Sequence, residues 1–297
     1  MEWTESLRSA IDYIEDHLLD NISAEDIADH VHVSSFYFQK GFKIMTGYSI
    51  GEYIRCRRLY LAALDIAAGK GKMIDIAFRY GYETPESFTK AFSRFHGISP
   101  MQMKGRSDKI RTFLPLKIRI LIQGGNQMDY AVEKKDKFQV IGFEREFSMD
   151  SSYREIPKFW DEFRENYLVR LLLGTEAPKN AAEQVICDCM VGKYGICIDD
   201  IGKYGRFRYL IAGDYQGGPV PDGMTVYEFP DMEWAKFRCV GPMPGALQSV
   251  NTKIFEEWLP GNPDYKIAAG YNIEWYSKGN MSAPDYESSI WVPVVRK

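Results

Sequence analysis

The chain of 297 residues has no apolar run of the roughly 18 residues that a membrane-spanning helix needs. Its amino terminus, MEWTESLRSAIDYIED, is acidic and lacks the basic and apolar regions of a secretory signal peptide. The five cysteines are odd in number and scattered, which argues against a disulfide framework. We therefore expect a cytoplasmic protein without a membrane partner.

Residue patterns that carry common enzyme chemistry are also scarce. The chain has four histidines, all near its amino-terminal end: His17, His30, His32 and His96. Cys187 and Cys189 form a close pair without a second pair or a neighbouring histidine, which is a weak metal signal. The sequence contains no glycine-rich phosphate loop and no nucleophile motif. We expect no enzyme activity, no metal and no cofactor.

The charged residues are unevenly distributed along a chain whose length fits two domains. The net charge is −4, which argues against a nucleic-acid partner at first sight. Residues 1–33, however, hold one basic and nine acidic side chains, whereas residues 34–106 hold twelve basic and five acidic ones. Positive charge gathered in one region is the electrostatic footprint of a DNA-binding protein.

Two similar helix-turn-helix patterns follow each other in that region. In the first, Ser23 and Asp26 resemble a capping box, and Ser34 or Ser35 starts the second helix. In the other, Thr84-Pro85 starts the second helix and Gly97 ends it. The short helix before it is marked by three apolar residues: Ile74, Ala77 and Phe78.

Each second helix is expected to bury one face and expose the other. In the first unit the exposed face holds an aromatic ring, an amide and two cations: Phe36, Gln39, Lys40 and Lys43. In the second unit Phe88, Phe92 and Phe95 are core, and the opposite face holds Ser87, Lys90, Ala91 and Arg94, with Thr89 beside them. Such groups can contact base edges and phosphates, although one such face alone equally suits solvent exposure. Their repetition favours DNA binding.

A single helix from Ile50 to Lys70 is expected to join the two units. Its apolar residues recur at helical spacing: Ile50, Ile54, Leu61 and Leu64. Arg55, Arg57 and Arg58 cluster midway and are expected to contact phosphates or to form surface charge. The helix spans about 30 Å, close to the roughly 34 Å between successive major-groove faces. One chain could then place two recognition helices in adjacent grooves.

Three motifs in this region resemble the AraC/XylS family of bacterial transcription regulators: TGYSIGEYIRCRRL from Thr46, IAFRYGY from Ile76 and FTKAFSRFHGISP from Phe88. The resemblance covers about residues 5 to 105 and implies a seven-helix domain that binds double-stranded promoter DNA. Matched by position, the residues implied to face DNA are Phe36, Gln39, Lys40, Glu86, Ser87, Thr89 and Lys90. We add Lys43, Arg55 and Arg94 as expected DNA contacts.

The rest of the chain is expected to be an α+β domain. We place the DNA-binding domain at residues 1–106, a linker at 107–111 and the second domain at 112–297. Alternating apolar residues from Leu116 predict a strand to Gln123, followed by a turn at 124–126. Strands are also expected at 130–133, 138–146, 195–198, 207–214 and 225–229, and Pro157 fits the first turn of a helix.

An internal repeat indicates how this second domain is built. Val140-Ile141-Gly142 followed by FWDEF from Phe159 is echoed by Cys239-Val240-Gly241 followed by FEEWL from Phe255. We infer two strand-helix-strand-strand modules joined in one antiparallel sheet, with two helices on one face.

Aromatic residues are concentrated in the second domain and suggest a ligand cleft. Each one singly favours core packing, but their number favours a cleft lined by several of them. Our candidates for the lining are Trp160, Tyr167, Tyr209, Trp234, Trp258, Tyr276 and Trp291. Glu274 lies in an otherwise aromatic and apolar strand. If it faces the cleft it favours a lipophilic cation, whereas the alternative is a rim or solvent-facing carboxylate.

Segments 235–242, 271–277 and 286–294 resemble the GyrI-like effector-binding domain, which implies a duplicated module with a ligand cleft and an acidic residue matched here by Glu274. We therefore predict a transcription regulator that senses a small lipophilic or cationic effector, with activation among the expected modes. Two alternatives for the second domain remain open. It could hydrolyse a small electrophile through Glu274 with Tyr209 or Tyr276, or it could bind a protein such as RNA polymerase.

Overall fold

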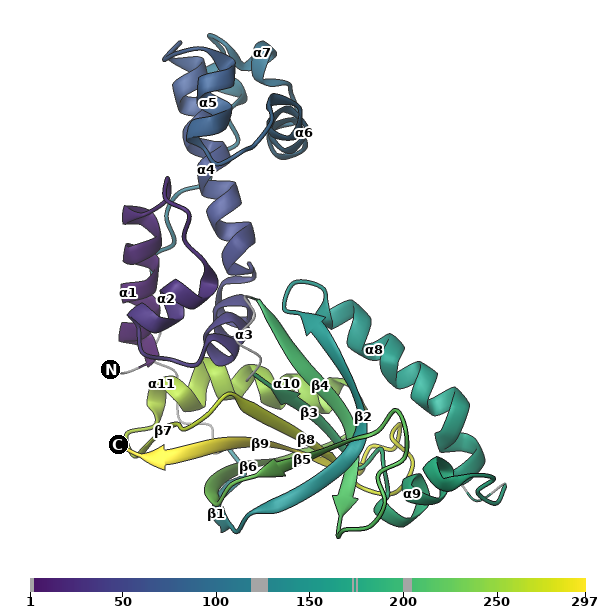
Figure 1. Ribbon diagram of the computed structural model, residues 1–297. Helices are drawn as coiled ribbons and strands as arrows, with labels where there is room; N and C mark the ends of the chain where they lie inside the picture. Colours follow the sequence, from purple (N-terminus) through teal and green to yellow (C-terminus); the bar gives the residue numbers. More distant parts are fainter. Residues whose placement is uncertain (1–2, 119–127, 173, 175, 200–204) are drawn as a thin grey trace. The chain divides into compact units, whose positions relative to one another are not determined.

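The computed structural model describes residues 3–118, 128–172, 174, 176–199 and 205–297. The chain forms two compact units. Unit 1 comprises residues 1–32 and 46–123, and unit 2 comprises residues 33–45 and 124–297 (Figure 1). Unit 2 thus contains most of helix α3 (Ser35–Thr46), the first helix predicted to read DNA. Among the described residues, none of the helices is long and apolar enough to cross a membrane.

In the described part of unit 1, residues 3–32 and 46–118, the regular structure is helical. Its helices are α1 (Trp3–Asp16), α2 (Ala24–His30), α4 (Ile50–Ala67), α5 (Met73–Arg79), α6 (Pro85–His96), α7 (Pro100–Met103) and the short 3-10 helix η1 (Ser107–Lys109). The predicted capping box at Ser23 and Asp26 is confirmed. Thr84 caps α6 by accepting from the Ser87 amide at 3.1 Å, and Gly97 ends this helix with φ of 78°. Only glycine adopts that backbone conformation without steric cost.

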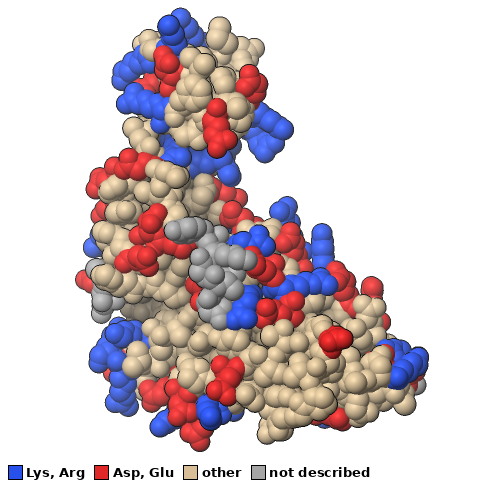
Figure 2. All heavy atoms as spheres, viewed as in Figure 1, with Lys and Arg blue, Asp and Glu red and all other residues tan. Residues whose placement is uncertain are grey.

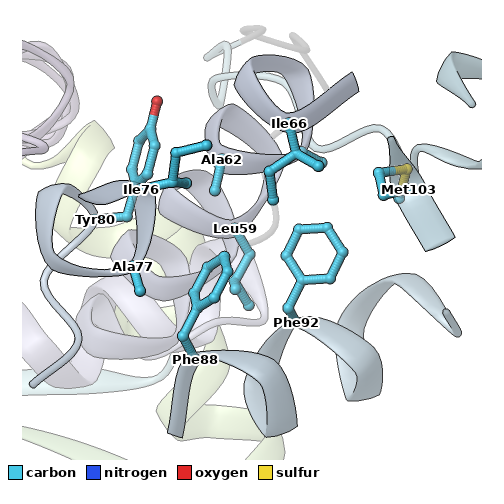
Figure 3. Close-up of a cluster of buried hydrophobic side chains, with 10 residues drawn as sticks. Leu59, Ala62, Ile66, Ile76, Ala77, Tyr80, Phe88, Phe92 and Met103 are labelled. Atoms are coloured by element: carbon cyan, nitrogen blue, oxygen red, sulfur yellow. The ribbon is translucent and has the colours of Figure 1, made fainter. Parts of the chain in front are cut away.

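The core of the second helix-turn-helix lies against the carboxy-terminal half of α4 (Figure 3). Phe88 and Phe92 of α6 are fully buried there, as the sequence predicts. The side chains around them come from α4, α5 and α7: Leu59, Ala62, Ile66, Ile76, Ala77, Tyr80 and Met103. The alanines allow the helices to approach closely, so α6 is held with its opposite face turned outward.

Three apolar residues predicted to mark buried faces are instead exposed. Leu64 is 41% exposed, Ile74 46% and Phe78 52%. Helix α4 buries residues on several sides, including Tyr53, Ala62 and Ala63, so its contacts do not follow one stripe. A single amphipathic stripe describes a helix with one packing partner, and α4 has more than one.

Arg57 corrects the prediction that the arginines of α4 contact phosphates or form surface charge. It is buried, and its Nε donates to Glu15 Oε1 at 2.8 Å while its Nη2 donates to Glu15 Oε2 at 2.7 Å. Its Nη1 also donates to the Phe113 carbonyl at 2.5 Å. Arg58 donates to the carbonyls of Leu18 and Asp20. Both side chains therefore tie α4 to other parts of unit 1, whereas Arg55 is exposed.

We expect Arg57→Met to reduce the free energy of unfolding by about 3 kcal/mol, because it leaves the Glu15 carboxylate without its buried partner. Arg55→Ala removes the same charge from an exposed position of the same helix and is the matched control. Urea denaturation monitored by circular dichroism measures both variants. Equal midpoints for the two variants would show that the ion pair does not hold unit 1 together.

Unit 2 contains a nine-stranded antiparallel sheet with helices on one face. Its strands are β1 (Tyr130–Lys135), β2 (Phe138–Ser148), β3 (Tyr194–Ile198), β4 (Arg206–Tyr215), β5 (Thr225–Phe229), β6 (Met232–Val240), β7 (Tyr265–Ile267), β8 (Tyr271–Tyr276) and β9 (Glu287–Arg296). Its helices are α8 (Ser152–Phe163), α9 (Ala181–Cys189), α10 (Gly245–Lys253), α11 (Leu259–Gly261) and two π-helical segments, η2 (Arg164–Leu172) and η3 (Ile254–Trp258). The predicted α+β fold class, with a helical domain and a domain built on an antiparallel sheet, is confirmed.

The sheet is built from two related modules that meet at its centre. From the central β3–β8 pair outward the order is β3, β4, β2 on one side and β8, β9, β6 on the other. In each module the outer strand is followed by a helix that packs on the sheet, α8 on β2 and α10 on β6. The helices thus flank the central strands, which leaves room for a cleft between them.

The opposite face of the sheet encloses an apolar core. Strands β5 and β6 are separated by two residues although they stand at nearly opposite ends of the strand order. The sheet therefore curves until these ends approach each other, and the rings of Phe229 and Trp234 lie 5.8 Å apart. Tyr194, Ile196, Leu210 and other alternating residues fill the enclosed side. This core fixes the positions of the central strands.

The structure differs from the sequence-based expectation at Pro157 and does not describe most of the strand predicted from Leu116. Pro157 lies inside α8, which begins five residues earlier at Ser152, so its placement in the first turn is wrong. The ring removes only one helical hydrogen bond, and the helix continues through it. Most of the strand predicted from Leu116 to Gln123 and the turn at 124–126 lie outside the described residues, and 116–118 form no strand.

Candidate DNA-binding and ligand-binding sites

Helix α6 presents the side chains that the sequence analysis assigns to DNA. Glu86, Ser87, Thr89, Lys90 and Arg94 are all exposed, and four of these lie in the first two turns of the helix. A shallow hollow lies between Glu86, Thr89 and Lys90. Lys and Arg side chains are prominent around α5 to α7, and acidic side chains around α1 and α2 (Figure 2). The arrangement suits a negatively charged partner at α6.

Helix α3 differs, because its predicted exposed face is covered within unit 2. Phe36 is only 3% exposed, and its ring lies 5.4 Å from that of Phe207 on β4. The Phe36 amide donates to Asp199 Oδ2 at 2.9 Å, just after β3. The neighbouring Tyr37 hydroxyl donates to the Tyr271 carbonyl on β8. The periodicity of one helix shows which residues share a face, but not that a distant strand covers it.

The cations of α3 also contact unit 2. Lys40 Nζ donates to Asn272 Oδ1 at 3.1 Å and lies 6.0 Å from the centre of the Phe255 ring. Lys43 Nζ lies 5.2 Å from the centre of the Tyr153 ring on α8. Gln39 donates to Ser35 Oγ within the helix at 2.9 Å. Three of the four side chains predicted to face DNA from α3 therefore have partners in unit 2 outside the helix itself.

A cleft of about 1100 Å³ lies on the helical face of the sheet in unit 2. One wall is α8, through Tyr153, Ile156 and Trp160, and another is α10, through Leu247 and its neighbours. The floor consists of outward-facing residues of the central strands: Cys197, Phe207, Tyr209, Glu274 and Tyr276. Phe36 and Lys40 of α3 also line the cleft. This is the space that the two flanking helices leave between the modules.

Glu274 lies in the floor of the cleft as part of a hydrogen-bonded aromatic network. The Tyr276 hydroxyl donates to Glu274 Oε2 at 2.7 Å, and the Tyr209 hydroxyl donates to the same oxygen at 3.4 Å. Trp160 Nε1 donates to the Tyr209 oxygen at 2.8 Å. Burial raises the pKa of both phenols well above 10, and the Glu274 charge adds to each shift. Both tyrosines therefore remain neutral donors that hold the carboxylate in place.

Gly195 makes this network possible. It stands opposite Glu274 on the neighbouring strand β3, and the Tyr209 side chain of β4 reaches over it. A Cβ at this position would lie 2.2 Å from the Tyr209 oxygen and 3.2 Å from Glu274 Oε2. The first contact is far inside van der Waals distance, so a larger residue would displace the tyrosine. The bare backbone leaves room for the hydroxyl and the carboxylate above the sheet.

Four of the eight predicted ligand-binding residues line the cleft, namely Trp160, Tyr209, Glu274 and Tyr276. The other four lie elsewhere. Tyr167 stacks on Phe143 with ring centres 5.3 Å apart, and Trp258 packs edge-on against Phe237. Trp234 and Trp291 belong to the core on the opposite side of the sheet. Among the strand residues, parity separates Trp234 and Trp291 from Tyr209, Glu274 and Tyr276, because alternate residues of a strand face opposite sides.

Several cleft residues escaped the sequence analysis, among them Tyr153, Cys197 and Phe207. Two signals could have found the aromatic pair. Phe207 lies two residues before Tyr209 on one strand, so both face the same side. Tyr153 precedes Trp160 by seven residues, which places both on one face of a helix. Among the described residues, no group of three or more His, Cys, Asp or Glu side chains could hold a metal.

Comparisons with known proteins agree with this architecture. A family model described as integron-associated effector binding protein matches residues 131–294, and a helix-turn-helix domain model matches residues 27–106. The HTH-type regulator YbfP of Bacillus subtilis, described as uncharacterized, is 29% identical over 147 residues, and this chain spans half of its length. The match covers 47% of this chain.

Two further proteins are similar to separate parts of the chain. The multiple antibiotic resistance protein MarA of Salmonella typhimurium is 31% identical over 116 residues, covering 37% of this chain and 89% of MarA. The structure of SAV2435 bound to tetraphenylphosphonium is 20% identical with a TM-score of 0.45, covering 57% of this chain and 94% of that one. The chain therefore belongs to the integron-associated effector-binding protein family and carries a helix-turn-helix domain of the AraC type at its amino-terminal end.

Proposed function

We propose that the protein is a transcription regulator that binds promoter DNA and senses a lipophilic cation in the cleft of unit 2. The observation that supports the sensing role most strongly is the partly buried aromatic network around the Glu274 carboxylate. The AraC-type domain supports the DNA-binding role. RNA polymerase remains a predicted further partner of an activator of this kind.

The exposed face of α6 supports binding in a major groove. Lys90 and Arg94 can contact guanine or phosphate oxygens, while Ser87 and Thr89 can contact bases or phosphates with their hydroxyls. The capped amino terminus of α6 is also turned outward, where its amides favour a phosphate. The buried phenylalanines on the other side hold this face rigidly in position.

We expect Lys90→Ala to weaken binding to a specific duplex about tenfold, which corresponds to the loss of about 1.4 kcal/mol. Sites are first enriched from a random duplex pool with the wild-type protein, and affinities are then measured by fluorescence anisotropy at fixed salt. Lys266→Ala removes the same charge from an exposed position on β7 and is the matched control. Enrichment of no sequence, or equal affinity of the two variants, would contradict DNA recognition through α6.

The chemistry of the cleft favours an aromatic or otherwise lipophilic cation. Aromatic faces of Trp160, Phe207 and Tyr276 offer apolar contact and cation–π attraction, and Glu274 supplies the opposite charge. Two neutral phenols share Glu274 Oε2, so they orient the carboxylate without neutralising it.

We expect tetraphenylphosphonium, used as a large aromatic cation, to quench tryptophan fluorescence in a saturable manner. Glu274→Gln should weaken this binding about tenfold, because it removes the charge from a partly enclosed site while keeping its shape. Glu256→Gln changes an exposed carboxylate on η3 and serves as the control. Triphenylphosphine oxide, a neutral molecule of similar size, should bind both variants equally. Identical cation affinity of wild type and Glu274→Gln would contradict the assigned role.

The cleft also bears on the hydrolase alternative. A carboxylate beside two phenols could act on an electrophile, but both hydroxyls donate to Glu274 Oε2 and so occupy the oxygen that would serve as a base. We therefore propose binding without turnover. Incubation with a reactive epoxide, followed by product analysis of wild type against Glu274→Gln, distinguishes the two functions.

A further inference from the structure

We propose that the cleft of unit 2 holds the recognition helix α3 in a state that cannot bind DNA, and that a lipophilic cation bound at Glu274 releases it. The inference rests on the proposed function, since it requires α3 to enter a major groove and a cation to occupy the cleft. What it adds is a physical connection between the two activities, made by the side chains of one helix.

The contacts that hold α3 use the same face that would read bases. Phe36, Lys40 and Lys43 are spaced by four and three residues, so they lie on one side of the helix. In unit 2 these side chains contact Phe207, Asn272 and Tyr153 respectively. A base pair and a β-strand cannot occupy the same face at once. Docking of α3 on the sheet and insertion of α3 into DNA are therefore mutually exclusive.

The amino terminus of α3 is a second, independent reason why the docked helix cannot bind DNA. The amides at a helix amino terminus attract anions, and DNA-binding helices commonly offer them to phosphates. In this structure the Asp199 carboxylate accepts from the Phe36 amide at 2.9 Å. Asp199 thus occupies the position that a DNA phosphate would take. The protein supplies its own carboxylate in place of the anion carried by the DNA backbone.

Ligand binding acts on this docked helix because the two share a cleft. Lys40 lines the same cavity as Glu274, and its partner Asn272 lies two residues from Glu274 on the same face of β8. Burial raises the pKa of the nearby Cys197 thiol to about 12, and Lys40 and Glu274 act on it with opposite sign. Lys40 therefore lies within the electrostatic reach of the site.

A cation in the cleft would oppose the docking of α3 in two ways. Its charge repels the Lys40 ammonium across a poorly solvated space, where such interactions are stronger than in water. Its rings also compete with Phe36 for the aromatic surface formed by Phe207 and the residues around it. Both effects favour the undocked helix, so the bound cation should raise the affinity for DNA.

The test uses unit 2 residues that hold α3 and lie outside the Glu274 network. Asp199→Ala removes the carboxylate at the helix amino terminus, and Asn272→Ala removes the partner of Lys40. Without ligand, each full-length variant should bind the enriched duplex about tenfold more tightly than wild type, because a charge-assisted hydrogen bond is worth roughly that factor. Asp222→Ala, an exposed carboxylate, is the control and should match wild type.

The response to tetraphenylphosphonium completes the experiment. In wild type and Asp222→Ala, a saturating concentration should raise the DNA affinity, while in Asp199→Ala and Asn272→Ala the increase should be largely lost. Quenching of tryptophan fluorescence by the cation shows that a variant keeps a folded cleft. Because two different variants are used, the test still holds if one of them fails to fold.

Particular outcomes would overturn the proposal while leaving the proposed function intact. If DNA binding and cation quenching are both present, yet the docking variants bind DNA like wild type, α3 is not held back by the cleft. A cation that lowers DNA affinity, or leaves it unchanged, contradicts release. By contrast, absence of specific DNA binding or of saturable quenching in wild type would contradict the function itself.

Discussion

The constraint on which the rest of this structure depends is that the face of α3 with Phe36, Lys40 and Lys43 packs against unit 2. The other side of this helix carries Phe38 and Phe42, which are fully buried. The remaining face combines an aromatic ring with two long cations, and those groups suit both a nucleic-acid groove and an aromatic, carboxylate-bearing surface. The sheet of unit 2 offers such a surface, with Phe207 on β4, Asn272 on β8 and Asp199 directly after β3.

The duplicated architecture explains why a ligand cleft occurs next to that surface. Two modules meet at the β3–β8 pair, and each contributes one flanking helix, so the centre of the sheet is left uncovered between α8 and α10. The curved sheet fills its enclosed side with apolar residues and fixes the register of these strands. Gly195 then leaves space for Tyr209 and Glu274 on the side of the cleft. Binding chemistry and helix docking thus use neighbouring positions of the same three strands.

Sequence patterns predicted the local structure well and the long-range contacts poorly. Capping residues, such as Thr84 and Ser23, and the buried phenylalanines of α6 were identified because helix starts and helical periodicity depend on nearby residues. The role of Arg57 could not be found in this way, since its partner Glu15 lies in another helix far along the chain. The same holds for Phe36, whose burial depends on strands more than 150 residues away.

In the candidate ligand site, too, local patterns are predictable from the sequence and long-range contacts are not. The sequence left open whether Glu274 faces the cleft, and the structure places it there on the same side of β8 as Tyr276. Trp234 and Trp291 were grouped with them only by composition, and strand parity turns both into the enclosed core. Composition indicates that an aromatic cleft is present, but the pairing of strands decides which rings form it.

Hydrogen exchange of α3 measures most directly whether its face with Phe36, Lys40 and Lys43 is shared between the cleft and DNA. Peptides covering residues 33–45 are followed by mass spectrometry with and without saturating tetraphenylphosphonium, in the absence of DNA. If the cleft holds α3, the cation should speed exchange in this segment while it protects peptides that contain Trp160 and Glu274. Protection of the cleft peptides without any change in residues 33–45 would contradict the coupling of ligand binding to release of the helix.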